Sequence, residues 1–211
     1  DIRTRHEPAS IITANNVFAH IDDLGGVLDG VGTLLADDGV FVFEVSYLVD
    51  VFEDTLFDTI YHEHLAYHAV GPLVKFMRAH EMELIGAERV SSHGGSLRAI
   101  AQKKNGPKPV SNSVADLVEL EQKMGLDRAE TYREFGSRIE VLKIELSSLL
   151  KDKKARGRAI AAFGAPAKAT TLMYHFGIAD DVIDFIVDDS PLKQGLYSPG
   201  MHIPVVPSSA I

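Results

Sequence analysis

The pattern of apolar and polar positions at the start of the chain predicts a strand, a helix and a second strand. A β-branched apolar run over residues 10–14 stops at two asparagines, as in a buried strand with a polar tip. Apolar residues recur every three or four positions over 24–35, which predicts a helix, and the Asp-Asp-Gly sequence at 37–39 is expected to close it. Residues 40–45 are nearly all apolar, as in a strand covered on both faces. This succession favours a parallel pair of strands with a right-handed crossover.

The next part of the chain predicts a long loop and an antiparallel hairpin. Residues 46–68 are rich in Phe, Tyr, His and acidic side chains without a regular period, so we expect an irregular loop with a function. A helix is expected to begin at Gly71-Pro72. Two strand patterns, 82–90 and 96–103, flank the glycine-containing turn 91–95 and predict a hairpin at the edge of the sheet.

A second α/β domain is expected after residue 104, where a Gly- and Pro-rich stretch marks a change in composition. We therefore divide the chain into a domain at 1–104 and a domain at 105–211. Helical patterns over 111–124 and 128–153 open the second domain. Another strand, helix and strand follow at 159–163, 167–176 and 182–187. The predicted fold class is α/β.

Composition and charge exclude several classes of function. The 211 residues include 30 acidic and 21 basic side chains, a formal charge of −9, so no nucleic-acid partner is expected. The sequence has no cysteine, which excludes disulfides, thiolate zinc sites and cysteine nucleophiles and is consistent with a reducing cytoplasm. No apolar run is long enough to span a bilayer and the N-terminus lacks a signal pattern, so we expect a cytoplasmic protein with no membrane partner.

The motif Tyr61-His62-Glu63-His64 in the long loop is the densest group of reactive side chains. A carboxylate orients an imidazole and raises its basicity, and a phenol can donate to a developing oxyanion, so the motif is suited to enolisation. His20 is a further candidate, and the alternative is that these are ordinary surface histidines. A metal site is a third interpretation, because His64 and His68 would share a face of a helix, although local spacing offers no third ligand.

A glycine turn in the second domain is a candidate anion site. The sequence Phe163-Gly164-Ala165-Pro166-Ala167-Lys168 places backbone amides and Lys168 at a helix N-terminus, where a phosphate can bind. Asp188 follows Gly164 by 24 residues, where a dinucleotide fold has its ribose-binding acid. Two of the three glycines of the dinucleotide fingerprint are missing, so an NAD-dependent oxidoreductase and a purely structural turn are both open alternatives.

Two smaller groups complete the candidates. His93, followed by two glycines, and Arg98 combine a permissive backbone with a guanidinium that could bind an anion, and a plain hairpin turn is the alternative. Asn15 and Asn16 follow a strand of the predicted parallel pair, and ligands of open α/β sheets bind outside such strand ends. Asparagine is also a common helix cap.

These segments, in this order, resemble the S-adenosylmethionine-dependent C-methyltransferases that act on nucleotide-linked 4-keto-deoxysugars. The resemblance covers nearly the whole chain, and the Tyr-His-Glu-His motif together with the Gly-Ala-Pro-Ala-Lys turn is its most specific feature. The matching segments are Asn15–Ile21, Phe43–Val45, Phe57–His64, His93–Arg98, Phe163–Lys168, Val187–Pro191, Lys193–Gly195 and Pro199–Pro204.

The resemblance implies that the chain is the C-terminal half of a larger enzyme. Members of the family generally carry, upstream, a cysteine-rich zinc domain and the first half of the methyltransferase fold with its glycine-rich cofactor loop, and neither is in this sequence. The implied fold is the C-terminal half of a Rossmann-like methyltransferase sheet followed by a second, smaller Rossmann-like α/β domain. The implied cofactor is S-adenosylmethionine, and the implied partners are a nucleotide-sugar substrate and the missing N-terminal half.

The resemblance also implies a role for each candidate residue. His64 would be the general base that removes the proton α to the sugar ketone, Glu63 would support it, and Tyr61 and His20 would line the reacting centre. Asn15 and Asn16 would lie near the cofactor. The residues expected to bind the substrate are His93, Arg98, Gly164 and Lys168, and no metal is expected. An NAD-dependent oxidoreductase and a non-catalytic fragment that binds a nucleotide sugar are the alternatives.

Overall fold

The computed structural model describes residues 2–210 and divides into two compact units. The first unit runs to Thr55 and resumes over His62–Tyr132. The second consists of the short segment Leu56–Tyr61 and the chain from Arg133 on. These units reflect packing within the chain, and the division at residue 104 stays a prediction about the domains.

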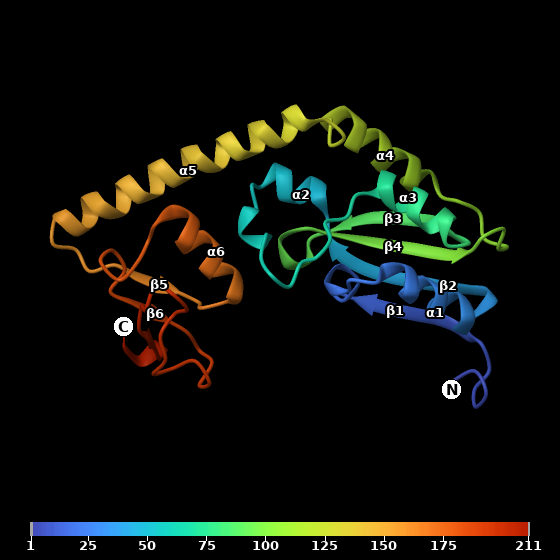
Figure 1. Ribbon diagram of the computed structural model, residues 1–211, viewed down its shortest axis with the longest axis horizontal. Helices are drawn as coiled ribbons and strands as arrows, with labels where there is room; N and C mark the ends of the chain where they lie inside the picture. Colours follow the sequence, from blue (N-terminus) through green and yellow to red (C-terminus); the bar gives the residue numbers. More distant parts are fainter. Residues whose placement is uncertain (1, 211) are drawn as a thin grey trace. The chain divides into compact units, whose positions relative to one another are not determined.

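The first unit is built on a four-stranded sheet. Its strands follow the order β1-β2-β4-β3 (Figure 1). They are β1 (Ala9–Asn15), β2 (Leu35–Ser46), β3 (Met82–Val90) and β4 (Ser96–Lys103). β1 and β2 are parallel, whereas β4 runs antiparallel to both β2 and β3. The predicted parallel pair is confirmed, and so is the predicted hairpin, with β3 on the edge of the sheet.

Among the described residues, four α-helices lie wholly within the first unit. They are α1 (Leu24–Leu34), α2 (Leu48–Glu53), α3 (Val70–Ala79) and α4 (Asn112–Met124). The carboxylate of Asp23 caps α1 by accepting from the amide of Gly26 at 2.8 Å. Both α3 and α4 pack beside β3 (Figure 1). The core contains the fully buried side chains of Phe18, Phe41, Phe43, Val45 and Leu97.

Two local expectations for this unit are wrong. The Asp-Asp-Gly sequence at 37–39 does not close α1 but lies inside β2, because the chain turns extended at Leu35. Gly39 suits this place, since a Cβ there would lie 2.8 Å from the carbonyl oxygen of Ala9 on β1. The loop at 46–68 is also not wholly irregular, because it contains α2 and the 3₁₀ turn Phe57–Thr59.

The second unit contains a long helix and a small parallel sheet. Its elements are α5 (Ala129–Ala155), which begins in the first unit, β5 (Ala161–Phe163), α6 (Ala167–Phe176), β6 (Phe185–Val187) and β7 (Val205–Val206). The strands pair in the order β5-β6-β7, and all are parallel. Gly177, in the left-handed conformation, ends α6. The predicted strand, helix and strand are confirmed, with shorter strands than expected.

The α/β fold class is therefore confirmed in both units. No helix within residues 2–210 combines the length and the apolar content needed to cross a membrane.

Candidate active site

His64 lies between the 3₁₀ turn Phe57–Thr59 and α3, and its segment is hydrogen-bonded to the turn that follows β1. The backbone amides of Leu65 and Ala66 both donate to the carbonyl oxygen of Ala19, at 3.0 and 3.2 Å. The imidazole centroids of His64 and His20 are 5.0 Å apart, and the ring planes are tilted by 42°. The structure thus brings these two predicted residues together although 44 positions separate them in the sequence.

The His64 ring packs against a neighbouring ring and is still partly accessible to solvent. Its side chain is half-buried and that of His20 is exposed. The ring of Tyr67 meets the His64 ring edge-on, with centroids 6.2 Å apart. An imidazole that packing orients, yet leaves in reach of a bound molecule, can take a proton from that molecule.

The remaining residues of the motif do not all belong to the same compact unit. Tyr61 is the last residue of the segment that belongs to the second unit, and His62 is the first to return to the first unit. The nearest oxygen of Glu63 lies 3.9 Å from Nε2 of His62, and both side chains are well exposed. The predicted support of His64 by Glu63 stays a prediction, as does the role of Tyr61.

Asn15 and Asn16 mark the carboxyl end of β1. Asn15 is opposite Glu44 in the parallel ladder, and the amide of Asn16 donates to the carbonyl oxygen of Glu44 at 2.8 Å. Asn16 has a φ of 53°, and the chain turns there toward His20. Both asparagine side chains are exposed, so they stand where open α/β sheets bind ligands.

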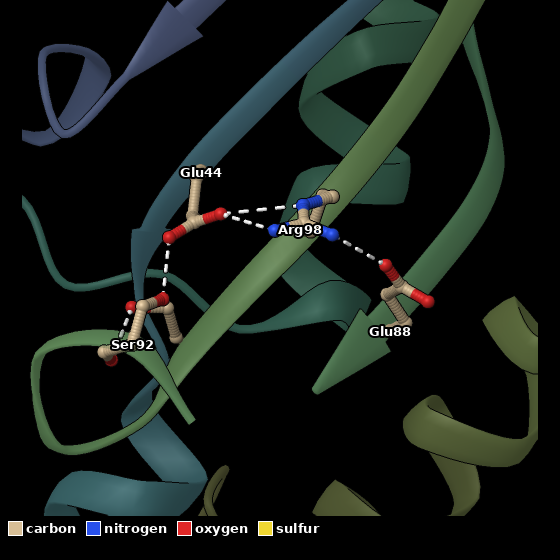
Figure 2. Close-up of polar contacts among 5 residues, drawn as sticks. Glu44, Glu88, Ser92 and Arg98 are labelled. Carbon is tan, nitrogen blue, oxygen red and sulfur yellow. Dashed lines mark hydrogen bonds and ion pairs between the residues drawn. The ribbon is translucent and has the colours of Figure 1, made fainter. Parts of the chain in front are cut away.

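A row of charged side chains crosses β2, β4 and β3 beside this strand end, and it was not predicted. Glu44, Arg98 and Glu88 occupy directly paired positions on the three strands. Figure 2 shows Nη2 and Nε of Arg98 donating to Oε2 of Glu44, at 3.0 and 3.2 Å, and Nη1 reaching Glu88 at 3.1 Å. Ser92 donates to the other oxygen of Glu44 at 2.5 Å.

This row stabilises the ionised form of Glu44 and pairs Arg98 with carboxylates of the chain. The hydrogen bond from Ser92, aided by Arg98, lowers the pKa of the buried Glu44 carboxyl. The guanidinium of Arg98 is neutralised by two carboxylates of the chain itself. Its proposed contact with substrate stays a prediction, and an incoming anion would have to compete with Glu44 and Glu88. The sequence feature that could have indicated this row is Glu44, the only charged residue in the apolar run 40–45.

The turn that carries His93 is held in an unusual backbone conformation. His93, Gly94 and Gly95 have φ values of 52°, 86° and 122°. A Cβ on Gly95 would lie 2.4 Å from the Cβ of Asp50, so this position requires glycine for space as well as for conformation. The turn therefore holds His93 in one place relative to β4.

Gly95→Ala is expected to destabilise the protein by about 2–4 kcal/mol, because the new methyl group clashes with Asp50 and the φ is unfavourable. Urea unfolding measures the loss. The matched control is Gly30→Ala in α1, where nothing lies within 4 Å of the new Cβ. A helical alanine should raise stability by up to about 1 kcal/mol. Equal stability of the two variants would contradict the tight approach at Gly95.

In the second unit, the glycine turn is closed by Asp188. One carboxylate oxygen of Asp188 accepts from the amide of Ala165 at 2.8 Å and from Nζ of Lys193 at 3.1 Å, and the other accepts from the amide of Ser190 at 2.9 Å. The two amides, with Lys193, lower the pKa of this carboxyl. Both oxygens are thus engaged by the chain, so a ribose hydroxyl that bound Asp188 would have to share the carboxylate with these donors.

Lys168 stands at the start of α6, beside a cavity within the second unit. Its ammonium is 3.8 Å from a carboxylate oxygen of Asp58. The cavity has a volume of about 260 Å³; Gly164, Lys168 and Asp58 line it together with apolar side chains of α5 and α6. Gly164 has a φ of 86°, as the turn requires. Their binding of substrate stays a prediction.

His68 is a core residue, and this overturns the premise of the metal interpretation. The segment that contains His64 and His68 is not helical, so the two side chains do not share a helix face. The ring of His68 is 6% exposed and stacks on Phe18 with centroids 5.6 Å apart. Across residues 2–210, no three His, Cys, Asp or Glu side chains are grouped so as to hold a metal ion.

Burial of His68 makes stability depend on pH. Desolvation lowers its folded-state pKa to about 4, against about 6.5 in an unfolded chain. Between these values the unfolded state binds the extra proton, so stability present above pH 6.5 is lost as the pH falls toward 4, by about 3 kcal/mol in all.

This loss should shrink in His68→Phe, and urea unfolding of both proteins from pH 8 to pH 4 tests it. The reference is the difference in unfolding free energy between the wild type and His68→Phe at pH 8, where His68 is neutral in both the folded and the unfolded state. Parallel pH profiles would contradict a buried neutral imidazole at this position.

Comparisons with known proteins show the family to which this chain belongs. The profile described as a methyltransferase domain matches residues 1–89, and the one described as a C-methyltransferase C-terminal domain matches residues 91–211. Both are methyltransferase profiles. The chain belongs to the C-methyltransferase family, as predicted.

A curated relative supports this membership along the chain. The C-methyltransferase NovU of Streptomyces niveus is 36% identical over 205 residues, which are 97% of this chain and 49% of the relative. The chain therefore spans about half the length of that relative.

Solved methyltransferases resemble the chain only in part. One is the 1,6-didemethyltoxoflavin-N1-methyltransferase of Burkholderia thailandensis with bound S-adenosylhomocysteine, at 20% identity and a TM-score of 0.36, covering 46% of this chain and 44% of that one. Another is the magnesium protoporphyrin IX methyltransferase of Synechocystis PCC 6803, also with S-adenosylhomocysteine, at 9% identity and a TM-score of 0.37, covering 49% of each chain. Scores this low indicate partial overlap only.

Proposed function

We propose that the whole enzyme transfers a methyl group from S-adenosylmethionine to the carbon next to the ketone of a nucleotide-linked 4-keto-deoxysugar, and that this chain supplies the base. The observation that carries the proposal is the half-buried imidazole of His64, held 5.0 Å from His20 by a segment bound to Ala19. Membership of the C-methyltransferase family supports the carbon acceptor.

The chain provides one edge of a cofactor site. The exposed Asn15 and Asn16, at the carboxyl end of a parallel strand, fit a polar ligand at that edge. When bound, S-adenosylmethionine supplies a methyl group on a positively charged sulfur. In this proposal, Asn15 and Asn16 hold its polar groups, together with upstream residues of the whole enzyme.

The chemistry assigned to this chain is removal of a proton from carbon. The neighbouring carbonyl makes that proton acidic enough for a neutral imidazole, and His64 accepts it. Tyr61 and His20 are proposed to donate hydrogen bonds to the enolate oxygen. A positioned base contributes about 10²–10⁴-fold and an oxyanion donor about 10²–10³-fold in rate. His93, Arg98, Gly164 and Lys168 are proposed to bind the nucleotide sugar.

The test uses the full-length enzyme with S-adenosylmethionine and a panel of nucleotide-linked 4-keto-deoxysugars. The expected product carries one new methyl group on the carbon next to the ketone, as located by NMR. In D₂O without S-adenosylmethionine, the same position should exchange its proton for deuterium. Methylation at oxygen or nitrogen, or no exchange with any member of the panel, would contradict the proposal.

A binding role without chemistry is distinguished by the chain of residues 1–211 alone. Calorimetry with a nucleotide sugar and with S-adenosylmethionine measures what this portion binds. We expect weak binding of S-adenosylmethionine, because the family's glycine-rich loop is not in this sequence. Tight binding of NAD by the same chain would instead favour the oxidoreductase alternative.

A further inference from the structure

The turn between β3 and β4, in the first unit, lies at the edge of the sheet where β2 ends. Val90, the last residue of β3, pairs with Ser96, the first residue of β4, and Ser96 also pairs with Ser46 at the end of β2. The turn 91–95 carries His93, one of the residues proposed to bind the nucleotide sugar. All of these residues belong to the first unit.

Ser92, the residue before His93, is held through both its side chain and its carbonyl oxygen. The hydroxyl donates to Oε1 of Glu44 at 2.5 Å. The carbonyl oxygen accepts from the hydroxyl of the buried Ser96 at 3.0 Å and from the amide of Gly95 at 2.9 Å. The two bonds to the carbonyl stay within the turn and the start of β4, whereas the bond to Glu44 joins the turn to β2.

The carboxylate of Glu44 is a strong acceptor because it is buried, ionised and bonded on both oxygens. Glu44 is 8% exposed. Its second oxygen, Oε2, accepts from Nη2 and Nε of Arg98 at 3.0 and 3.2 Å, so the carboxylate lies between Arg98 and Ser92 (Figure 2). The bond from Ser92, together with Arg98 and the nearby His93, lowers the pKa of this carboxyl. Hydrogen bonds to a charged group are stronger than those between neutral groups.

The main chain of Glu44 is attached to the end of β1. Its carbonyl oxygen accepts from the amide of Asn16 at 2.8 Å, and Glu44 is paired with Asn15 in the parallel ladder. Residues paired across a ladder present their side chains on the same face of the sheet. Glu44 therefore lies between the two asparagines proposed to hold the cofactor and the turn proposed to bind the substrate.

We propose that Glu44 is a positioning residue for His93 and acts through the hydroxyl of Ser92, an inference that rests on the proposed role of His93 in binding the nucleotide sugar. The carboxylate fixes Ser92 to β2, and the residue that follows Ser92 is thereby held near the end of β1. When this contact is lost, binding of the sugar has to order the turn, and that ordering weakens affinity. The effect is expected on the KM for the nucleotide sugar, while turnover at saturating sugar is kept.

The test is a double-mutant cycle in the full-length enzyme with Glu44→Ala, Ser92→Ala and the two combined. Each single variant should raise the KM for the nucleotide sugar about 5–20-fold, with kcat changed less than about threefold. The combined variant should exceed the larger single effect by less than about twofold, because both substitutions break the same contact. Ser92→Thr, which keeps a hydroxyl, should restore most of the affinity for the sugar.

Two variants serve as matched controls. Ser91→Ala changes the neighbouring, exposed serine of the same turn. Glu88→Ala removes the exposed carboxylate that Arg98 also contacts, and it leaves the bond between Ser92 and Glu44 in place. Each control should keep the KM within about twofold of wild type. A rise in both controls equal to that in Ser92→Ala would overturn the proposal, because it would report general loosening of the hairpin.

A wild-type KM in Ser92→Ala would also overturn the proposal, and so would additive effects of Ser92→Ala and Glu44→Ala. Ser92→Ala carries the same comparison with its controls if Glu44→Ala does not fold. Hydrogen exchange gives a readout that does not need methyl transfer, since Ser92→Ala should speed exchange of the amides of His93, Gly94 and Gly95, whereas Ser91→Ala should not. If the wild-type enzyme methylates no sugar, the proposed function fails, and unchanged exchange in Ser92→Ala separately overturns the role of Glu44.

Discussion

His64→Asn in the full-length enzyme is expected to lower kcat for methyl transfer by about 10²–10⁴-fold, the contribution of one positioned base. Asparagine keeps a polar side chain in the half-buried space beside His20 but cannot accept the proton. The loss should therefore fall on kcat. The affinity for S-adenosylmethionine, measured by calorimetry, should stay within about threefold of wild type.

The matched control for His64→Asn is His80→Asn. His80 is also a half-buried histidine of the first unit, near Asp29 at 3.7 Å, and is no part of the proposed site. It should retain turnover within a few-fold. Deuterium exchange next to the ketone should be lost in His64→Asn and kept in His80→Asn. Unchanged turnover in His64→Asn would remove His64 from the mechanism.

Glu121→Ala is expected to cost about 3–5 kcal/mol of unfolding free energy, because three donors, two of them buried and one half-buried, would lose their acceptor. Glu121, on α4, is 5% exposed. Its carboxylate accepts from the amides of Val70 and Gly71 at 2.5 and 2.8 Å, and from the hydroxyl of Tyr47 at 2.8 Å. It therefore caps the N-terminus of α3, where a negative charge is favourable, and urea unfolding measures the loss.

Two further variants separate the buried carboxylate from a general effect of charge. Glu121→Gln keeps one acceptor oxygen and should fall between the wild type and Glu121→Ala. Glu119→Ala, an exposed glutamate of the same helix paired with Lys123, should change stability by less than about 1 kcal/mol. Burial and the bond to Glu121 raise the pKa of Tyr47, so Glu121→Ala should lower it in an ultraviolet titration. Equal losses in Glu119→Ala and Glu121→Ala would contradict the cap.

Elements with a strong local signal were predictable from the sequence. The helix α6 begins after Pro166 and ends at a left-handed Gly177, and its bounds match the apolar period. The antiparallel pair β3 and β4 was equally clear, because each strand is continuous and a glycine turn separates them. These elements depend on residues that are close together in the sequence, so the local pattern of residues predicts them.

Features that depend on distant contacts were not predictable. The Asp-Asp-Gly sequence at 37–39 resembles a helix end, yet pairing of β2 with β1 draws it into a strand, with Gly39 against Ala9. β7 has only two residues and exists through pairing with β6. The Glu121 cap joins residues 51 positions apart, and no local pattern encodes that distance.

The candidate site was predictable to the extent that family resemblance carries it. The sequence named both the Tyr-His-Glu-His motif and His20 as candidates, but His20 lies 44 residues before His64, and only the folded chain brings the two rings within 5.0 Å of each other. The row formed by Glu44, Arg98 and Glu88 depends on strand register. Its absence from the sequence prediction explains why Arg98 was regarded as available to substrate.

The link from Glu121 to Val70 and Tyr47 has a consequence for biosynthesis. As the nascent chain leaves the ribosome, α3 emerges well before the residue that caps it, since Val70, the first residue of α3, precedes Glu121 by 51 positions. The first unit should therefore reach its final stability only after α4 has been translated. An expression boundary placed at residue 104 would remove that cap and yield a protein prone to aggregation, whereas one placed after Tyr132 would retain it.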